Sequence, residues 1–223
     1  WLGWARARDH IDHHRPALPP APRPPVAIRP RRMSVSAVEQ WIANPYAPFA
    51  SRILRLEPLA PLGKMPDASL KGSIIHDVLA TFAKNYPTSL PGTPEDVERQ
   101  LVEIARERLA PYLSNPRIRA FWLPRFERFA KWFAESEAER RKDSSGVLAE
   151  ISGMMIVTPL ADPFKLTARA DRIDVTPAGL VITDYKTGQA PADTKVLTGQ
   201  APQLPLEAAI AIAGGFTGLN ATP

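Results

Sequence analysis

The chain has 223 residues, of which 44% are hydrophobic and 23% charged, as in a soluble globular protein with one large domain. It contains no cysteine, which excludes disulfides and thiolate-ligated zinc or iron–sulfur sites within these residues. The absence of cysteine also fits a cytoplasmic protein, which we expect. The apolar runs fall well short of the roughly 20 residues that span a bilayer. The net charge of +5 is compatible with an anionic partner such as nucleic acid.

The N-terminal region is predicted to be a linker. Residues 15–32 are rich in proline and arginine, a composition that favours an extended, semi-rigid tether. The chain begins at Trp1 rather than at methionine, so we expect a fragment of a longer protein. We assign residues 1–33 to a linker from a preceding domain, and residues 34–223 to one domain that is truncated at its C-terminal end.

Helices are predicted from capping signals and from the helical spacing of apolar residues. Ser34 is an N-cap, and Thr93 followed by Pro94 and two acids is a strong helix start. A bend is expected at Pro124. The predicted helices cover residues 34–43, 67–84, 93–113, 116–142 and 203 to about 213, with residues 93–142 forming a helical insertion.

Strands follow this insertion. Apolar, β-branched segments predict strands over 148–157, 165–175 and 180–186, separated by turns at 161–163 and 177–179. The order of helices, strands and a last helix indicates a mixed α/β domain.

Two acids and a lysine on these strands indicate a metal site. Asp171 and Asp184 lie on strands joined by a tight turn, so a hairpin would bring their carboxylates within a few ångströms. Such carboxylates repel each other unless a cation lies between them, and Mg²⁺ suits a site that also binds water and phosphate. Lys186, two residues after Asp184, would point to the same face. We therefore predict a phosphodiesterase site in which Lys186 positions or deprotonates a water, or neutralises charge. An ordinary surface hairpin is the alternative.

Other polar residues near these strands allow more than one interpretation. Asp174 faces away from Asp171 in a regular strand, and with Arg172 it forms either a structural pair or a DNA-facing pair. Contact of Asp174 with the metal is a further alternative. His76, on a predicted helix, is by itself more often a structural residue than a ligand. Gln203, at a helix start, has an amide that could reach a phosphate.

The predicted helix 116–142 combines aromatic and basic side chains. The aromatic residues have helical spacing and are expected in the core. The basic residues either line a DNA channel or form a solvated face. The aromatic residues are Phe121, Trp122, Phe126, Phe129, Trp132 and Phe133, and the basic ones are Arg117, Arg119, Arg125, Arg128, Lys131, Arg140, Arg141 and Lys142.

Four motifs stand in order within residues 34–220. They are Gly72-Ser-Ile-Ile-His76-Asp-Val-Leu79, Ala168-Arg-Ala-Asp171-Arg-Ile-Asp174, Asp184-Tyr-Lys186-Thr-Gly188 and Gln203-Leu-Pro-Leu-Glu207. With these motifs the chain resembles the RecB-like branch of the PD-(D/E)XK nucleases, and in particular the C-terminal nuclease domain of AddB, a subunit of AddAB helicase–nucleases. The resemblance implies a restriction-endonuclease-like core with a central mixed sheet flanked by helices, plus the helical insertion.

The resemblance implies roles for individual residues. His76, Asp171, Asp184 and the backbone carbonyl of Tyr185 would bind Mg²⁺, for which Mn²⁺ can substitute. Asp171, Asp184 and Lys186 would be the catalytic residues.

Weaker implications concern contacts with DNA and a further acid. Gln203, Arg172 and Thr187 would contact DNA. Glu150, on the first predicted strand, falls near an acid that is often present in the family. Glu207 replaces the tyrosine of the last motif, which leaves a DNA contact at that position in doubt.

Two further departures from the family pattern concern a glycine and a cysteine. Ala168 stands where glycine is usual in the second motif. Asn44 stands where many relatives have the first cysteine of an iron–sulfur staple. No iron–sulfur cluster is therefore expected.

The activity implied by the resemblance is Mg²⁺-dependent cleavage of one DNA strand by an exodeoxyribonuclease that processes double-strand breaks for recombinational repair. An AddA-like partner subunit would supply ATP-driven unwinding, and no membrane is involved. One alternative is a catalytically inactive module that guides DNA or binds a partner, although Asp171, Asp184 and Lys186 are intact. Another is an RNA-directed or defence nuclease on the same core, against which Asn44 and the helical insertion both count.

Overall fold

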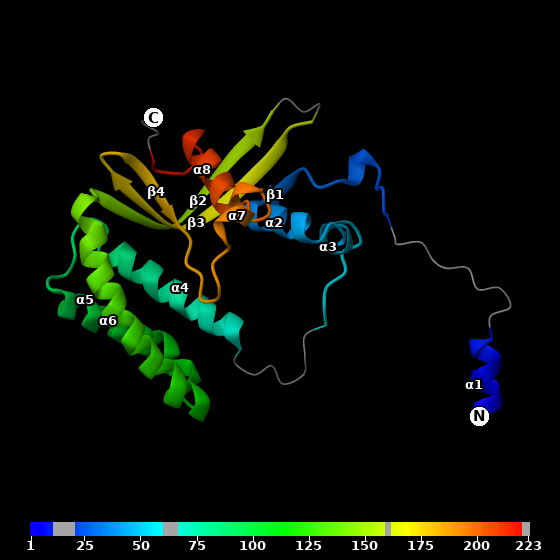
Figure 1. The fold of residues 1–223 in the computed structure, drawn as a ribbon, viewed down its shortest axis with the longest axis horizontal. Helices are drawn as coiled ribbons and strands as arrows, with labels where there is room; N and C mark the ends of the chain where they lie inside the picture. Colours follow the sequence, from blue (N-terminus) through cyan, green and yellow to red (C-terminus); the bar gives the residue numbers. More distant parts are fainter. Residues whose placement is uncertain (11–20, 60–66, 159–161, 220–223) are drawn as a thin grey trace.

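The computed structural model describes residues 1–10, 21–59, 67–158 and 162–219. Parts of the predicted linker (residues 11–20), of the turn at 161–163 and of the C-terminal end (220–223) lie outside the described residues. Figure 1 shows the strands β1 (Arg32–Ser34), β2 (Gly146–Val157), β3 (Phe164–Thr176) and β4 (Gly179–Thr183). The helices are α1 (Leu2–Asp9), α2 (Val35–Ala43), α3 (Tyr46–Pro48), α4 (Ala68–Asn85), α5 (Pro94–Leu109), α6 (Leu123–Arg140), α7 (Asp193–Leu197) and α8 (Gln203–Ile212).

The sheet is built around β3. β2 pairs antiparallel along one edge of β3, from Gly146 opposite Val175 to Val157 opposite Phe164. The other edge of β3 pairs first with β1, in parallel, and then with β4, antiparallel. The result is a four-stranded mixed sheet, and the predicted mixed α/β core with a central sheet flanked by helices is confirmed.

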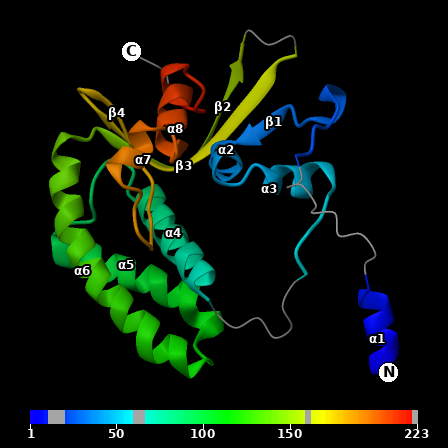
Figure 2. The same cartoon turned by 45° about the vertical axis from the view of Figure 1, so that its right-hand side comes forward.

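Helices cover the sheet from two sides, and each side has its own apolar core. Figures 1 and 2 show α4, α5 and α6 together on one side of the sheet, with α2 and α8 away from them. The core of the α4–α6 body includes Val78, Leu79, Phe82, Val97, Leu101, Ile104, Ile118, Phe126 and Phe133. The core beneath α2 and α8 includes Val35, Leu166, Ala168, Ala170, Ile173, Ile210 and Phe216.

Local capping signals fix the helix starts as predicted. The Ser34 side chain accepts a hydrogen bond from the backbone N–H of Ala37 (3.2 Å) and begins α2. At α5 the Thr93 hydroxyl accepts from the Asp96 N–H (3.4 Å), and the Asp96 carboxylate accepts from the Thr93 N–H (2.9 Å). This reciprocal capping box satisfies two backbone donors that a helix start otherwise leaves unpaired.

The elements differ from the predicted ones in three places. β1, α1, α3 and α7 are short and were not predicted. β4 ends at Thr183, so Asp184 and Lys186 lie in the loop after the strand rather than inside it. Pro124 lies in the first turn of α6 instead of at a bend, after a π-helical turn at Ile118–Trp122.

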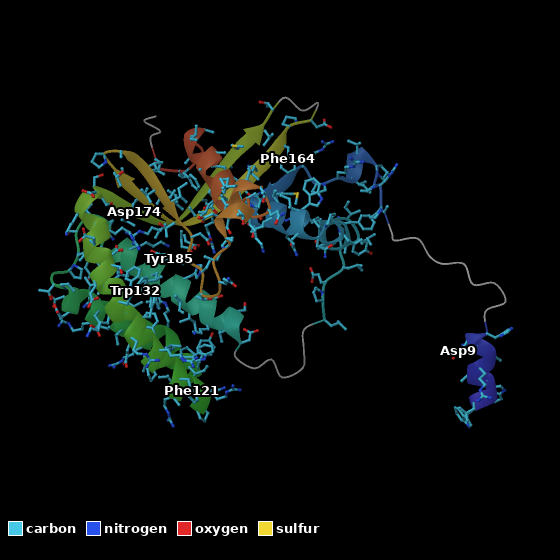
Figure 3. The ribbon with its side chains drawn as sticks, in the orientation of Figure 1. Asp9, Phe121, Trp132, Phe164, Asp174 and Tyr185 are labelled. Carbon is cyan, nitrogen blue, oxygen red and sulfur yellow. The ribbon has the colours of Figure 1, made fainter. Side chains whose placement is uncertain are left out.

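The expectation that all the aromatic side chains of the insertion belong to the core is wrong. Phe126 and Phe133 are buried, but Phe121 is 56% exposed and Trp132 is 58% exposed. Figure 3 places both exposed rings on the α6 side of the molecule, with Phe121 farther from the sheet. No helix within the described ranges is long and apolar enough to cross a membrane.

Candidate functional site

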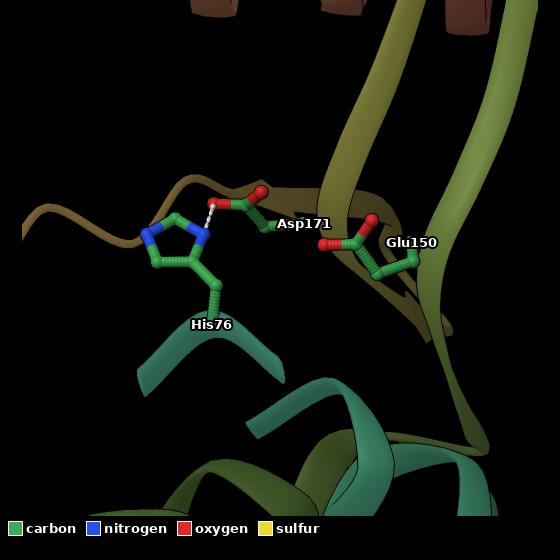
Figure 4. Close-up of side chains that lie close together, drawn as sticks. All are labelled: His76, Glu150 and Asp171. Carbon is green, nitrogen blue, oxygen red and sulfur yellow. Dashed lines mark ion pairs between the residues drawn. The ribbon is translucent and has the colours of Figure 1, made fainter. Parts of the chain in front are cut away.

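Three side chains from three elements meet at the junction of α4 with the sheet. His76 comes from α4, Glu150 from β2 and Asp171 from β3, and one nitrogen or oxygen of each lies within 4.8 Å of the others. The Nδ1 atom of His76 is 3.3 Å from Oδ2 of Asp171 (Figure 4). One imidazole and two carboxylates are suitable ligands for a divalent metal ion.

The start of α4 brings His76 to this junction. The Asp67 side chain caps the helix by accepting a hydrogen bond from the Leu70 N–H (2.9 Å). Gly72 lies one turn before His76, against the loop that follows β4. A Cβ atom at Gly72 would lie 3.3 Å from Oγ1 of Thr187. Glycine therefore allows the helix and the loop to approach closely.

The histidine and the aspartate stabilise each other's charged forms. The hydrogen bond with Asp171 raises the pKa of His76, and the Tyr185 backbone and the charge of Asp184 act in the same direction, against the effect of burial. Burial favours a higher pKa for Asp171, but hydrogen bonds from His76 and from the Tyr185 N–H (2.8 Å) outweigh it and lower that pKa. The site therefore favours an ionised Asp171 carboxylate, the form that binds a cation.

Asp184, Lys186 and Gln203 form a second group beside the first. The Lys186 Nζ atom lies 2.7 Å from Oδ2 of Asp184 and donates to Oε1 of Gln203 (3.1 Å). The Gln203 amide donates to Oδ1 of Asp184 (2.7 Å). The side chains of Asp184 and Lys186 therefore lie together, as their spacing predicted, although they lie beyond the strand. Gln203, at the start of α8, fixes both of them.

Glu150 has an unusual backbone for a strand residue. Its φ is 55°, in the left-handed region that residues other than glycine seldom adopt. The register of β2 and β3 places Glu150 opposite Asp171, between the pairs Ala149–Arg172 and Ile151–Ala170. Its carboxylate also pairs with Nε of Arg169 (2.7 Å). Backbone strain of this kind often occurs at functional sites.

Two cavities open at the cluster, and basic residues line both of them. One, of about 510 Å³, lies between Lys84, Arg169 and the three clustered side chains. The other, of about 580 Å³, reaches from Asp171 to Gln203 and Glu207, and it is also lined by Arg32, Lys165 and Arg169. Cations around an acidic centre would attract a phosphate backbone toward it.

Comparison with known proteins agrees with this arrangement. A family model described as the PD-(D/E)XK nuclease superfamily matches residues 32–220. The chain belongs to this superfamily. Its members are usually nucleases that use divalent metal ions, and the cluster of His76, Glu150 and Asp171 is a possible metal site.

Relatives of this PD-(D/E)XK domain occur in Rickettsia. An uncharacterized protein of Rickettsia conorii is 30% identical over 193 residues, which is 86% of this chain and 23% of the relative. One of Rickettsia typhi is 30% identical over 189 residues, or 84% of this chain and 22% of the relative. The chain therefore spans less than a quarter of the length of these curated relatives.

Arg172 is a structural residue of this PD-(D/E)XK domain, and the predicted contact of Arg172 with DNA is wrong. Its side chain is 1% exposed and donates two hydrogen bonds to Asp174 (2.6 and 2.7 Å). It also donates to Glu137 of α6 (2.7 Å) and to the Tyr185 hydroxyl (3.3 Å). Of the two interpretations of the Arg172–Asp174 pair, the structural one holds, because a buried guanidinium offers no surface to DNA. Glu137 was not recognised from the sequence, where it is one of several acids on an amphipathic helix.

Glu207 occupies a buried position next to this site. It is 1% exposed, and its Oε1 accepts a hydrogen bond from Gln203 (3.2 Å), whereas Oε2 has no hydrogen-bond partner among the described residues. Burial raises the pKa of Glu207 from 4.5 to about 7, and the nearby charges of Asp184 and Asp171 add to the effect.

This raised pKa predicts a pH-dependent stability. Between pH 4.5 and pH 7 the folded state keeps a proton on Glu207 that the unfolded state loses, so the free energy of unfolding falls as the pH rises, by at most about 3 kcal/mol. Glu207→Gln is expected to remove this slope and to be more stable than the wild type at pH 8. Urea unfolding in EDTA at pH 5 and pH 8 measures the effect. Glu107→Gln, at an exposed position of α5, is the control, and an unchanged slope in Glu207→Gln would contradict the assignment.

Proposed function

We propose that this domain is a Mg²⁺-dependent DNA nuclease in which Mn²⁺ can replace Mg²⁺. The main support is the convergence of His76, Glu150 and Asp171 within 4.8 Å, next to the linked pair of Asp184 and Lys186. A polar cluster built from a helix and neighbouring strands, beside cavities lined by basic residues, is what cleavage of a polyanion requires.

The side chains present fit a divalent cation. Asp171 and Glu150 lie opposite each other on neighbouring strands, and a cation between them would offset their repulsion. His76, Asp171 and Glu150 would bind it, with Asp184 and the Tyr185 carbonyl as the further ligands expected from the family motif. When bound, the cation would stabilise the charge that develops on the phosphate oxygens.

Lys186 is the proposed catalytic lysine. Its Nζ atom is held by Asp184 and Gln203, and its side chain is 41% exposed. A fixed and accessible ammonium can orient the attacking water, exchange a proton with it, or neutralise charge on the phosphate. Gln203 would act by positioning Lys186 and Asp184, and Thr187, which is exposed beside them, is a proposed contact to the DNA backbone.

We further propose that the parent protein is an AddB-like subunit of a helicase–nuclease with an AddA-like partner. In this role the domain would act as an exodeoxyribonuclease during processing of double-strand breaks for recombination. The order of the motifs along the chain supports this proposal, as does the greater length of the rickettsial relatives, which leaves room for other domains.

The metal site is tested by binding and by cleavage. Cleavage of linear DNA by the full chain is expected with Mg²⁺ or Mn²⁺ and not with EDTA. His76→Ala is expected to weaken Mn²⁺ binding at least tenfold, a loss at the low end of what changes around metal sites cause, roughly 10–100-fold. Isothermal titration with Mn²⁺ measures this affinity, and His10→Ala, outside the cluster, is the control.

The same measurements distinguish the alternative of an inactive module. Tight DNA binding without cleavage in any divalent metal would favour a domain that only guides DNA or holds a partner. Mn²⁺ affinity that is unchanged in His76→Ala would show that the cluster is not the metal site.

A further inference from the structure

A third cavity, of about 390 Å³, opens beside the Asp184–Lys186 group. It lies between α4, α6 and the loop after β4. Its walls include the aromatic residues Trp122, Phe129 and Trp132 from the helical insertion, with Ile75 and Leu79 of α4 opposite. Its volume is within the range of small-molecule sites.

This cavity is continuous with the proposed catalytic loop. Asp184, Tyr185, Lys186 and Thr187 line it together with the aromatic wall. A ligand in the cavity would therefore lie directly beside the group that we place at the scissile phosphate.

Two further cations, Lys71 of α4 and Arg125 of α6, line the same cavity. An apolar hollow edged by positive charge is complementary to a group with a flat ring and an attached phosphate.

The exposed ring in this wall is held in place by its neighbours. The ring centroid of Trp132 is 5.9 Å from that of Phe129, which is 5.7 Å from that of Phe133, and Phe133 is 6.4 Å from Tyr185. Phe133 is buried, whereas Trp132 is 58% exposed. Figure 3 shows Trp132 and Tyr185 on the α6 side of the sheet. Trp132 thus presents a large flat surface on a rigid support.

We propose that this cavity is a subsite for an unstacked nucleobase of the strand being cut, with Trp132 as the stacking platform and Lys71 and Arg125 as contacts to the adjoining phosphates. The proposal rests on the proposed nuclease function and deepens it. Stacking on an aromatic ring is tolerant of sequence, because every base has a π face. Bases inside a duplex are already stacked, so the subsite selects single-stranded segments over intact duplex.

The test is a binding experiment in EDTA, where no cleavage is expected. Fluorescence anisotropy would compare a labelled oligothymidine with an abasic oligonucleotide of equal length, which has the same phosphates and no bases. The full chain is expected to bind the oligothymidine roughly tenfold more tightly, and Trp132→Ala to lose most of this difference. Trp132→Phe should retain it, whereas Trp132→Leu, apolar but not aromatic, should lose it.

Matched controls make each outcome decisive. Trp41→Ala removes a tryptophan of α2 that is 50% exposed and outside the cavity, and it should bind like the wild type. The subsite is refuted if the abasic strand binds as well as oligothymidine, if Trp132→Ala or Trp132→Leu behaves like the wild type, or if Trp132→Ala weakens both strands equally. Base-dependent binding without cleavage in Mg²⁺ would support the subsite and count against the proposed nuclease function. Cleavage in Mg²⁺ without base-dependent binding would support the nuclease function and refute the subsite.

Discussion

Asp184→Asn is expected to reduce DNA cleavage by roughly 10³-fold while DNA binding is retained. A divalent metal contributes several kcal/mol of stabilisation to a developing negative charge, and each 1.4 kcal/mol is a tenfold change in rate. The substitution removes a carboxylate charge beside the cluster and the ionic partner of Lys186, whose Nζ lies 2.7 Å away. Gln203, which donates to the same carboxylate, would remain in place. Initial rates on linear DNA with saturating Mg²⁺ measure the effect, and binding of the same DNA with EDTA gives the comparison.

Asp193→Asn is the matched control for this experiment. Asp193 is an exposed aspartate at the start of α7. The same change of carboxylate to amide at this position is expected to leave the cleavage rate within about twofold of the wild type, as surface substitutions have small effects. A wild-type cleavage rate in Asp184→Asn would show that Asp184 is not a catalytic residue. Binding without cleavage in both proteins would support the inactive module.

Most of the fold could be predicted because its signals are local. Ser34 and Thr93 begin helices through hydrogen bonds to residues three positions away. The tight turn at 177–179 brings β3 and β4 side by side, so these two strands pair. The proximity of Asp184 and Lys186 also depends only on spacing along the chain. β1 could not be recognised because it is three residues long and its partner Leu166 lies far away in the sequence.

The part of the site that could not be predicted depends on a break in strand alternation. Adjacent residues of a regular strand point to opposite faces. Asp171 and Arg172 are adjacent, yet they contact His76 of α4 and Glu137 of α6, two helices of the same body. The residues on either side of this pair, Ala170 and Ile173, both belong to the core on the opposite side. The change of phase coincides with the left-handed backbone of Glu150, the residue opposite Asp171. Periodicity assigns one face to each residue in turn, so it cannot show such a break.

The burial of Arg172 could not be predicted from the sequence either, because its partner Glu137 is distant along the chain. Glu137 belongs to α6 and lies 35 positions before Arg172. Burial favours a higher pKa for Glu137, but Arg172 and Arg141 lower that pKa, so Glu137 is charged in the core. Arg141 donates to Glu137 (2.7 Å) and to the carbonyl of Pro87 (3.1 Å). The buried members of this group, Arg172, Arg141, Glu137 and Asp174, carry two positive and two negative charges and are balanced. The partly exposed Arg140 lies at the edge of the group, 3.7 Å from Glu137.

Removal of one charge from this balanced group is expected to be severely destabilising. Glu137→Ala leaves Arg172 with Asp174 alone and takes from Arg141 the carboxylate that it pairs with, so the free energy of unfolding should fall by about 3–5 kcal/mol. Glu127→Ala is the matched control on the same helix, because Glu127 pairs with Arg106 at the surface (3.1 Å). Loss of that exposed pair should cost at most about 1 kcal/mol. Urea unfolding of the two variants and the wild type measures both values.

The Glu137 variants also test whether the position of α6 affects metal binding at the site. Arg172 adjoins Asp171 in β3 and donates to the hydroxyl of Tyr185, whose backbone N–H donates to Asp171. If the charged group holds α6 against the sheet, then Glu137→Ala should weaken Mn²⁺ binding even at temperatures where the protein is folded, and Glu137→Gln, which keeps hydrogen-bonding atoms, should be less affected. Equal stability losses in Glu137→Ala and Glu127→Ala would contradict this view. They would mean that the apolar core of α4, α5 and α6 is sufficient to hold α6 in place.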